Sequence, residues 1–161
     1  MIMFCSCREV NPLREWVRQT VEQFGRDRHQ LLEILGHLQR GRSYLEKETL
    51  LAVAEELDLP AAEVYGTATF YSLYSTVPRG KHIIRVCENA PCHIDGAAAV
   101  LAAVQAYLGL QVNETTEDGR FTLETTSCLG ICSAAPALMI DDDVHGNLTP
   151  ESAVGILKNL A

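Results

Sequence analysis

Hydrophobic side chains recur at helical spacing through the first half of the chain, which predicts amphipathic helices. Asn11 and Pro12 are typical of a helix cap and first turn, and Gly25 is typical of a helix end. The apolar stripes place four helices at about 12–24, 27–40, 50–59 and 61–74. Short helices joined by brief links favour a small helical bundle.

The pattern changes at Pro78-Arg79-Gly80, where we place a boundary between domains at 1–78 and 79–161. The second domain is expected to contain strands at 82–86, 112–115, 121–126 and 137–140, and helices at 94–108 and from Thr149-Pro150 onward. The segments 117–119 and 141–146 are predicted turns. The chain is therefore predicted to be α+β, a helical bundle followed by an α/β domain.

Three aromatic residues lie near the end of the fourth predicted helix: Phe70, Tyr71 and Tyr74. Large aromatic side chains are usually buried, so we expect them in the core of the bundle. The alternative is that some of them face a partner protein, because aromatic residues are enriched at interface centres.

Charge and composition narrow the function classes. The formal net charge is −8, which argues against binding to nucleic acid or to an anionic membrane surface. The longest apolar stretch, 97–110, is too short to span a bilayer, and the first residues lack the pattern of a signal or transit peptide. A cytoplasmic protein is expected, in which six cysteines favour metal binding or redox chemistry over disulfides.

Four of the cysteines form two close pairs, each directly after a predicted strand. Cys87 and Cys92 are spaced C-x4-C, and Cys128 and Cys132 are spaced C-x3-C. Four thiolates suit an iron–sulfur cluster or zinc. Two separate pairs favour a [2Fe–2S] cluster over a [4Fe–4S] cluster, and the spacing leaves zinc open. Gly130 and the small uncharged residues around it would allow the backbone to approach the cluster closely.

The other candidate ligands have simpler interpretations. Cys5 and Cys7 lie outside the two pairs and are expected to be free surface thiols. His93 follows Cys92 directly, but four cysteines already complete a ligand set, so we expect no ligand role for it. The run Asp141-Asp142-Asp143 lacks the spacing of a calcium loop and is expected to be a solvated turn.

Several segments resemble one known family. The runs are Glu63 to Ser72, Gly80 to Ile84, Asp118 to Thr122 and Cys128 to Pro136. Together they resemble the thioredoxin-like [2Fe–2S] ferredoxin family, whose members are small subunits of NADH dehydrogenases (respiratory complex I) and of related hydrogenases and formate dehydrogenases. The four paired cysteines match the family's cluster ligands one for one.

The resemblance implies a thioredoxin-like second domain with one [2Fe–2S] cluster held by Cys87, Cys92, Cys128 and Cys132. It implies an electron-transfer subunit of a multisubunit NADH-linked oxidoreductase, with FMN and NADH only on a partner flavoprotein and with further iron–sulfur subunits beside it. No catalytic residue is expected in this chain. We expect a bacterial or archaeal protein, in the cytoplasm or at the cytoplasmic face of a membrane complex.

Two other functions stay open from the residues alone. One is a zinc-stabilised assembly subunit without a redox role. The other is a thioredoxin-like dithiol oxidoreductase, although neither cysteine pair has the C-x-x-C spacing of that chemistry. The parent complex, respiratory NADH dehydrogenase, hydrogenase or formate dehydrogenase, is not determined by the sequence.

Overall fold

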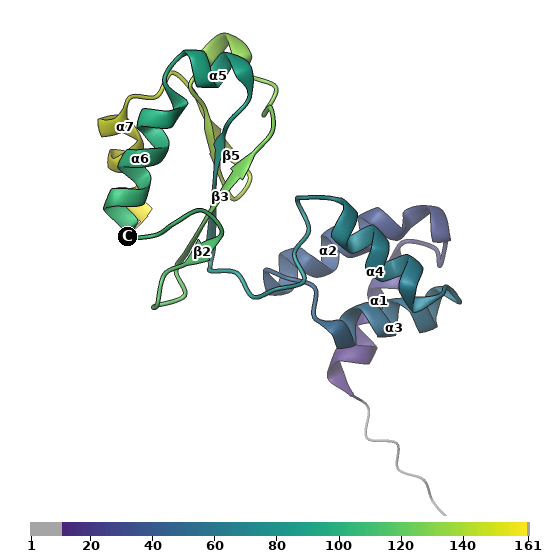
Figure 1. The fold of residues 1–161 in the computed structure, drawn as a ribbon. Coiled ribbons are helices and arrows are strands. Elements are labelled where there is room, and N and C mark those ends of the chain that lie inside the picture. Colours follow the sequence, from purple (N-terminus) through teal and green to yellow (C-terminus); the bar gives the residue numbers. More distant parts are fainter. Residues whose placement is uncertain (1–10, 161) are drawn as a thin grey trace, which may run out of the picture. The chain divides into compact units, whose positions relative to one another are not determined.

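The computed structural model describes residues 11–160, and its chain divides into two compact units between Pro78 and Arg79 (Figure 1). The first unit is helical within residues 11–78, and the second contains a sheet with helices. Mixed helices and sheet agree with the predicted α+β class. Among residues 11–160, none of the helices has the length and hydrophobicity of a membrane-spanning segment.

The helices of the first unit surround one apolar core. They are α1 (Pro12–Gln23), the 3-10 helix η1 (Arg28–Gln30), α2 (Leu31–Arg42), α3 (Lys47–Leu57) and α4 (Ala61–Phe70). The Asn11 side chain accepts a hydrogen bond from the Leu13 amide at 3.0 Å, which caps α1 as predicted. Fully buried core residues include Val17, Ile34, Leu35, Val53 and Val64.

The prediction of a buried aromatic stripe is wrong for two of its three residues. Phe70 is 79% exposed and Tyr71 is 43% exposed. Helix α4 ends at Phe70, not at Tyr74, and Tyr71 already has extended backbone geometry, so the helical period no longer aligns the three rings. Only Tyr74 packs against the core, where its hydroxyl donates to the Leu32 carbonyl at 2.7 Å.

The second unit is a five-stranded mixed sheet with its helices between and after the strands. Its elements are β1 (His82–Cys87), α5 (Ala90–Ile94), α6 (Ala97–Leu108), β2 (Glu114–Thr115), β3 (Phe121–Thr126), η2 (Cys132–Ala134), β4 (Leu138–Ile140), β5 (Asp143–His145) and α7 (Pro150–Leu160). The strand order is β2-β3-β1-β4-β5, in which β1 and β3 are parallel and the other neighbours are antiparallel.

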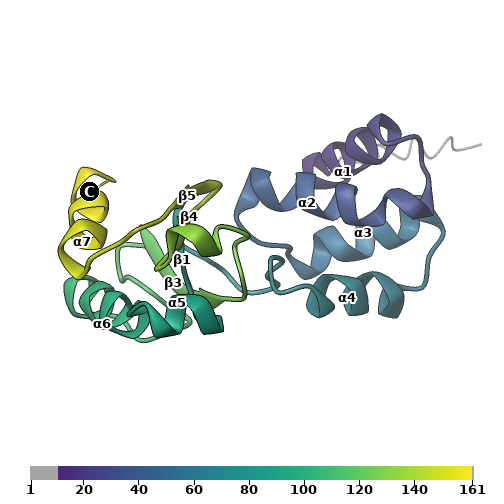
Figure 2. The same cartoon turned by 90° about the horizontal axis from the view of Figure 1, so that it is seen from above.

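The two faces of this sheet have different chemistry. Ile84 lies in register with Leu123 and Ile140, and this apolar face packs against α6 and α7 in one core (Figure 2). The neighbouring register position places Arg85 beside Glu124 on the opposite face. There the Glu124 carboxylate pairs with Arg85 at 3.0 Å and with Arg79 at 2.8 Å; the two arginine side chains are buried, and that of Glu124 is largely so, at 13% exposed.

Two predicted segments of the second unit differ from the structure. The helix predicted over 94–108 begins only at Ala97, because Gly96 before it has a φ of +99°, which a continuing α-helix excludes; Ile94 is the last residue of the separate helix α5. The segment 141–146, predicted as a turn, contains β5, which pairs with β4 through a tight turn at Asp141, where φ is +54°. Short hairpin strands of this kind carry too few residues to show a strand period.

Candidate metal centre

The first cysteine pair leaves the sheet at the end of β1. Cys87 is the last residue of the strand, and its amide donates to the Ala137 carbonyl at 3.0 Å. Cys92 lies in the short helix α5, whose start is capped by the Asn89 side chain accepting the Ala90 amide at 2.8 Å. Cys87 and Cys92 are 1% and 3% exposed, and both belong to one buried cluster.

The second cysteine pair lies in the loop between β3 and β4. The Sγ atoms of Cys128 and Cys132 are 3.1 Å apart, and both residues are exposed. Gly130 lies between them with a φ of +86°, and its amide donates to Cys128 Sγ at 3.3 Å. That backbone conformation favours glycine, so the expected role of Gly130 in close backbone approach agrees with the structure.

The four thiols form one electrostatic neighbourhood. Burial and then the hydrogen bond with Cys87 raise the pKa of the Cys92 thiol, which also interacts with Cys132. The hydrogen bond with Cys132 lowers the pKa of Cys128, and the Gly130 amide lowers it further. The same thiol–thiol bond raises the pKa of Cys132, which also interacts with Cys87. Packing agrees with this, because Leu129 and Ile131 of the second loop lie against the buried cluster that contains the first cysteine pair, 36 residues or more earlier in the sequence.

The surroundings of the buried pair are apolar. Ala97 and Ala137 are buried against Cys87 and Cys92, and Leu129, Ile131 and Ala135 pack partly buried beside them. The charged or polar neighbours Glu88 and His93 are exposed.

The donor set fits a [2Fe–2S] cluster in its chemistry. Within residues 11–160, no three histidine, cysteine, aspartate or glutamate side chains surround a common point as ligands of one metal ion. The four free cysteines nevertheless supply the number and kind of ligands that a [2Fe–2S] cluster needs, two thiolates at each of two irons. Cys5 and Cys7 lie outside the described residues.

Sequence reasoning missed the contacts that hold the second cysteine loop. The segment after β5 lies against it: the Asn147 amide donates to the Ala134 carbonyl at 2.6 Å, and the Leu148 amide donates to the Pro136 carbonyl at 3.1 Å. Gly146 is packed directly against Ala134. No local pattern marks these contacts, and the one available signal was the glycine in the turn before the last helix.

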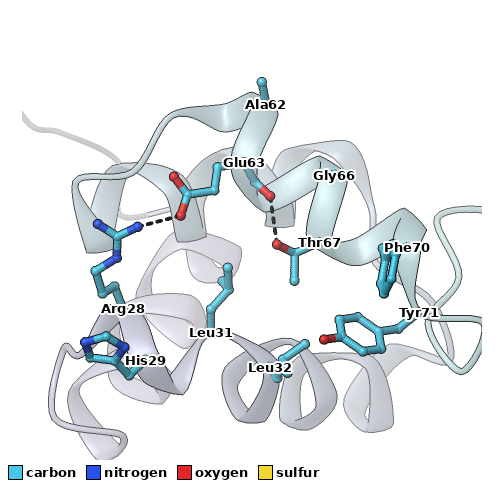
Figure 3. A pocket seen from close by; sticks show the side chains of 10 residues that line it. All are labelled: Arg28, His29, Leu31, Leu32, Ala62, Glu63, Gly66, Thr67, Phe70 and Tyr71. Carbon is cyan, nitrogen blue, oxygen red and sulfur yellow. Dashed lines mark hydrogen bonds and ion pairs between the residues drawn. The ribbon is translucent and has the colours of Figure 1, made fainter.

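A separate hollow of about 510 Å³ lies on the first unit, between the start of α2 and the exposed side of α4 (Figure 3). The Arg28–Glu63 ion pair, at 2.9 Å, crosses one end, and Phe70 and Tyr71 lie at the other. No cysteine lines this hollow, so it contributes nothing to the thiol centre.

Cysteine pairs in the loops of a mixed α/β unit are the kind of ligand set by which proteins hold an iron–sulfur cluster. The family model described as thioredoxin-like [2Fe–2S] ferredoxin matches residues 17–161, and the chain belongs to this family. The resemblance stated from the sequence is thereby confirmed.

Named relatives belong to two kinds of complex. The chain is 44% identical over 127 residues to the subunit of NADH-quinone oxidoreductase designated E in Pseudomonas aeruginosa, covering 79% of this chain and 76% of that protein. It is 36% identical over 146 residues to the HndA subunit of the NADP-reducing hydrogenase of Solidesulfovibrio fructosivorans, covering 91% of this chain and 85% of that protein.

A solved structure agrees in fold. A crystal structure of an NAD+-reducing [NiFe]-hydrogenase in the air-oxidized state matches with a TM-score of 0.67 and 26% identity over 77% of this chain. The match covers 22% of the hydrogenase chain, so this protein spans only part of the length of that chain.

Proposed function

We propose that this protein is the electron-transfer [2Fe–2S] subunit of a multisubunit NADH-linked oxidoreductase, with Cys87, Cys92, Cys128 and Cys132 as the cluster ligands. The observation that carries the proposal is the packing of the second cysteine loop, through Leu129 and Ile131, against the buried cluster that contains the first cysteine pair. The two thiols of that loop lie 3.1 Å apart. Family membership and the names of the relatives support it.

The two pairs have different tasks in this proposal. Cys87 and Cys92 hold the inner side in an apolar, dry environment, and Cys128 and Cys132 hold the side nearest to solvent. The Gly130 amide, which donates to Cys128 Sγ, offsets negative charge on that sulfur. When bound, a [2Fe–2S] cluster accepts and releases single electrons. The chain supplies ligands, orientation and electrostatics, and substrate chemistry lies on other subunits.

The electron partner in this proposal is a flavoprotein subunit that binds FMN and NADH, with further iron–sulfur subunits in the same complex. The similarity to subunits of an NADH-quinone oxidoreductase and of a hydrogenase supports such an assembly. The complex would work at the cytoplasmic side of a bacterial or archaeal membrane, or free in the cytoplasm. Respiratory NADH dehydrogenase, hydrogenase and formate dehydrogenase are all parent complexes compatible with the chain.

The compact units at 1–78 and 79–161 are proposed to be separate folding domains, a helical bundle and a thioredoxin-like cluster domain. Their separate apolar cores support this division. Limited proteolysis that cuts first between them and leaves the iron with the second fragment is the expected result.

The test of the ligand set is a pair of matched cysteine substitutions in the full chain, purified without oxygen. Cys92→Ala should lose the iron, the acid-labile sulfide and the visible absorption. Cys5→Ala, the same chemical change outside the ligand set, should keep about two irons per chain, as a [2Fe–2S] cluster requires. Full iron content in Cys92→Ala would refute the assignment.

Metal analysis, activity assays and EPR of the unsubstituted protein distinguish the proposed function from the two alternatives. Zinc in place of iron would mean an assembly subunit without a redox role. Disulfide reductase activity without iron would mean a dithiol enzyme. A one-electron EPR signal on reduction, with two irons and two sulfides per chain, is the result that the proposal requires.

A further inference from the structure

The loop that carries Cys128 and Cys132 has little structure of its own. Between the end of β3 and the start of β4 it contains only the three-residue helix η2. Both thiols are exposed, and the internal bonds of the loop are local: Gly130 to Cys128 Sγ, and the Ala134 amide to the Ile131 carbonyl at 2.9 Å. The position of this loop must therefore be fixed from outside it.

Besides the packing of Leu129, Ile131 and Ala135 against the buried cysteine pair, the segment 146–148 supplies hydrogen bonds to the loop. Its amides at Asn147 and Leu148 donate to the carbonyls of Ala134 and Pro136, at 2.6 and 3.1 Å. These two bonds attach the end of the cysteine loop to the chain that enters α7. The first acceptor lies only two residues from Cys132, so a shift of the segment would move that thiol.

Gly146 allows the close approach on which these bonds depend. A Cβ atom at this position would lie 2.6 Å from the Ala134 carbonyl oxygen and 2.8 Å from the Ala134 Cβ. It would also lie 3.1 Å from Ile131 Cδ1. The backbone of Gly146 is not in the left-handed region, so space rather than conformation requires the glycine. A side chain here would push the segment and the loop apart.

The segment itself is anchored. Leu148 is 7% exposed and belongs to the core beneath α6 and α7, and His145 before the segment pairs with Leu138 across the β4–β5 hairpin. The anchored residues therefore connect the sheet and its core to the cysteine loop. The connection is made by backbone atoms, which move less than long side chains.

We propose that Gly146, Asn147 and Leu148 form a positioning brace that sets the place of Cys132 and thereby tunes the cluster. The inference rests on the proposed function for its redox consequence, but the placement of the loop does not depend on metal. Hydrogen bonds to the sulfurs and their solvent exposure set the potential of such clusters. A displaced loop changes both at the exposed pair.

The test compares Gly146→Ala with Gly155→Ala in the full chain. Gly155 lies in α7 of the same unit, and a Cβ there would meet nothing within 4 Å. The first readout is amide hydrogen exchange over 128–136 and at Asn147. We expect about tenfold faster exchange in Gly146→Ala, since the loss of one hydrogen bond changes an opening equilibrium by roughly that factor. Gly155→Ala should match the parent.

The second readout is the reduction potential and the EPR spectrum of the reduced protein. Gly146→Ala should shift both and should lose iron to a chelator faster than the parent, whereas Gly155→Ala should not. Equal behaviour of the two variants in exchange and in spectrum would overturn the brace while leaving the proposed function intact. A parent without iron, combined with faster loop exchange in Gly146→Ala, would keep the brace and end the proposed function.

If Gly146→Ala does not fold, hydrogen exchange of the unsubstituted protein tests the brace. Low concentrations of urea should expose the amides of Asn147 and Leu148 and those of the cysteine loop together, because the two bonds join the segment to the loop. Continued protection of the segment while the loop becomes exposed would overturn the brace.

Discussion

Substitution of Thr49 is expected to raise the free energy of unfolding, whereas most core substitutions lower it. Its side chain is buried in the first turn of α3, and its hydroxyl has no hydrogen-bond partner within residues 11–160. A buried threonine inside a helix usually donates to the carbonyl four residues earlier, as Thr20 donates to Trp16 at 3.0 Å. For Thr49 that residue is Leu45, which precedes the helix.

Thr49→Val keeps the shape and the branched Cβ and removes only the unsatisfied hydroxyl. Leaving such a group buried costs about 1–3 kcal/mol, so the variant should raise the free energy of unfolding by about that amount. Thr20→Val is the matched control, because it makes the same change where the hydroxyl is bonded. It should lower the free energy of unfolding by about 0.5–1.5 kcal/mol.

Trp16 makes the measurement specific to the first unit. It is the single tryptophan of the chain, and it packs against the helical core. Urea unfolding followed by its fluorescence therefore reports on this unit, and each kcal/mol moves the midpoint by roughly 0.3–1 M. A lower midpoint in Thr49→Val would refute the reasoning, as would equal shifts of the same sign in both variants.

Two further predictions concern charged groups of the second unit. Glu124→Leu should lower the stability by about 3–5 kcal/mol, because it leaves the Arg85 guanidinium buried without its carboxylate; hydrogen exchange at the β1 and β3 amides measures it, and parent-like exchange would contradict it. The hydrogen bond from the Thr116 hydroxyl, and then the Arg120 amide, lower the pKa of Asp118. The stabilisation by Asp118 is therefore full above its unfolded-state pKa and is lost as the pH falls through the folded value. A carboxyl titration by NMR should show the lowered pKa returning toward its ordinary value in Thr116→Val, and an unchanged titration would contradict the assignment.

Local rules were enough for most of the helices. The cap at Asn11 and the apolar stripes of α1 to α3 depend on neighbours within four residues, which the sequence displays directly. The end of α4 was misplaced because Tyr71 and Tyr74 continue an apolar pattern after the helix has stopped. Their exposure differs because tertiary contacts decide it: Tyr74 has the Leu32 carbonyl as partner, whereas Tyr71 lies at the rim of the surface hollow.

Sheet pairing was less predictable than helix formation, because its partners are far apart in sequence. The apolar run at β1 predicted a buried strand, but nothing in it indicated parallel pairing with β3 and antiparallel pairing with β4. The buried Arg85 and Glu124 are a case in point. Each alone suggests a solvated position in a strand, and only the register that places them side by side explains why both can be buried.

The thiol centre depends both on local sequence patterns and on contacts between residues far apart in the sequence. Ligand chemistry is carried by residue type and spacing, so Cys87, Cys92, Cys128 and Cys132 are candidate ligands on the sequence alone. Ligand position is not local, because the exposed cysteine loop is held by amides that follow β5, more than ten residues later. Gly146 carries no chemical signal, and the need for a glycine there arises from the backbone and side-chain atoms of Ala134 and Ile131 packed against it. A chain could therefore keep all four cysteines and still place its cluster differently through changes confined to 146–148.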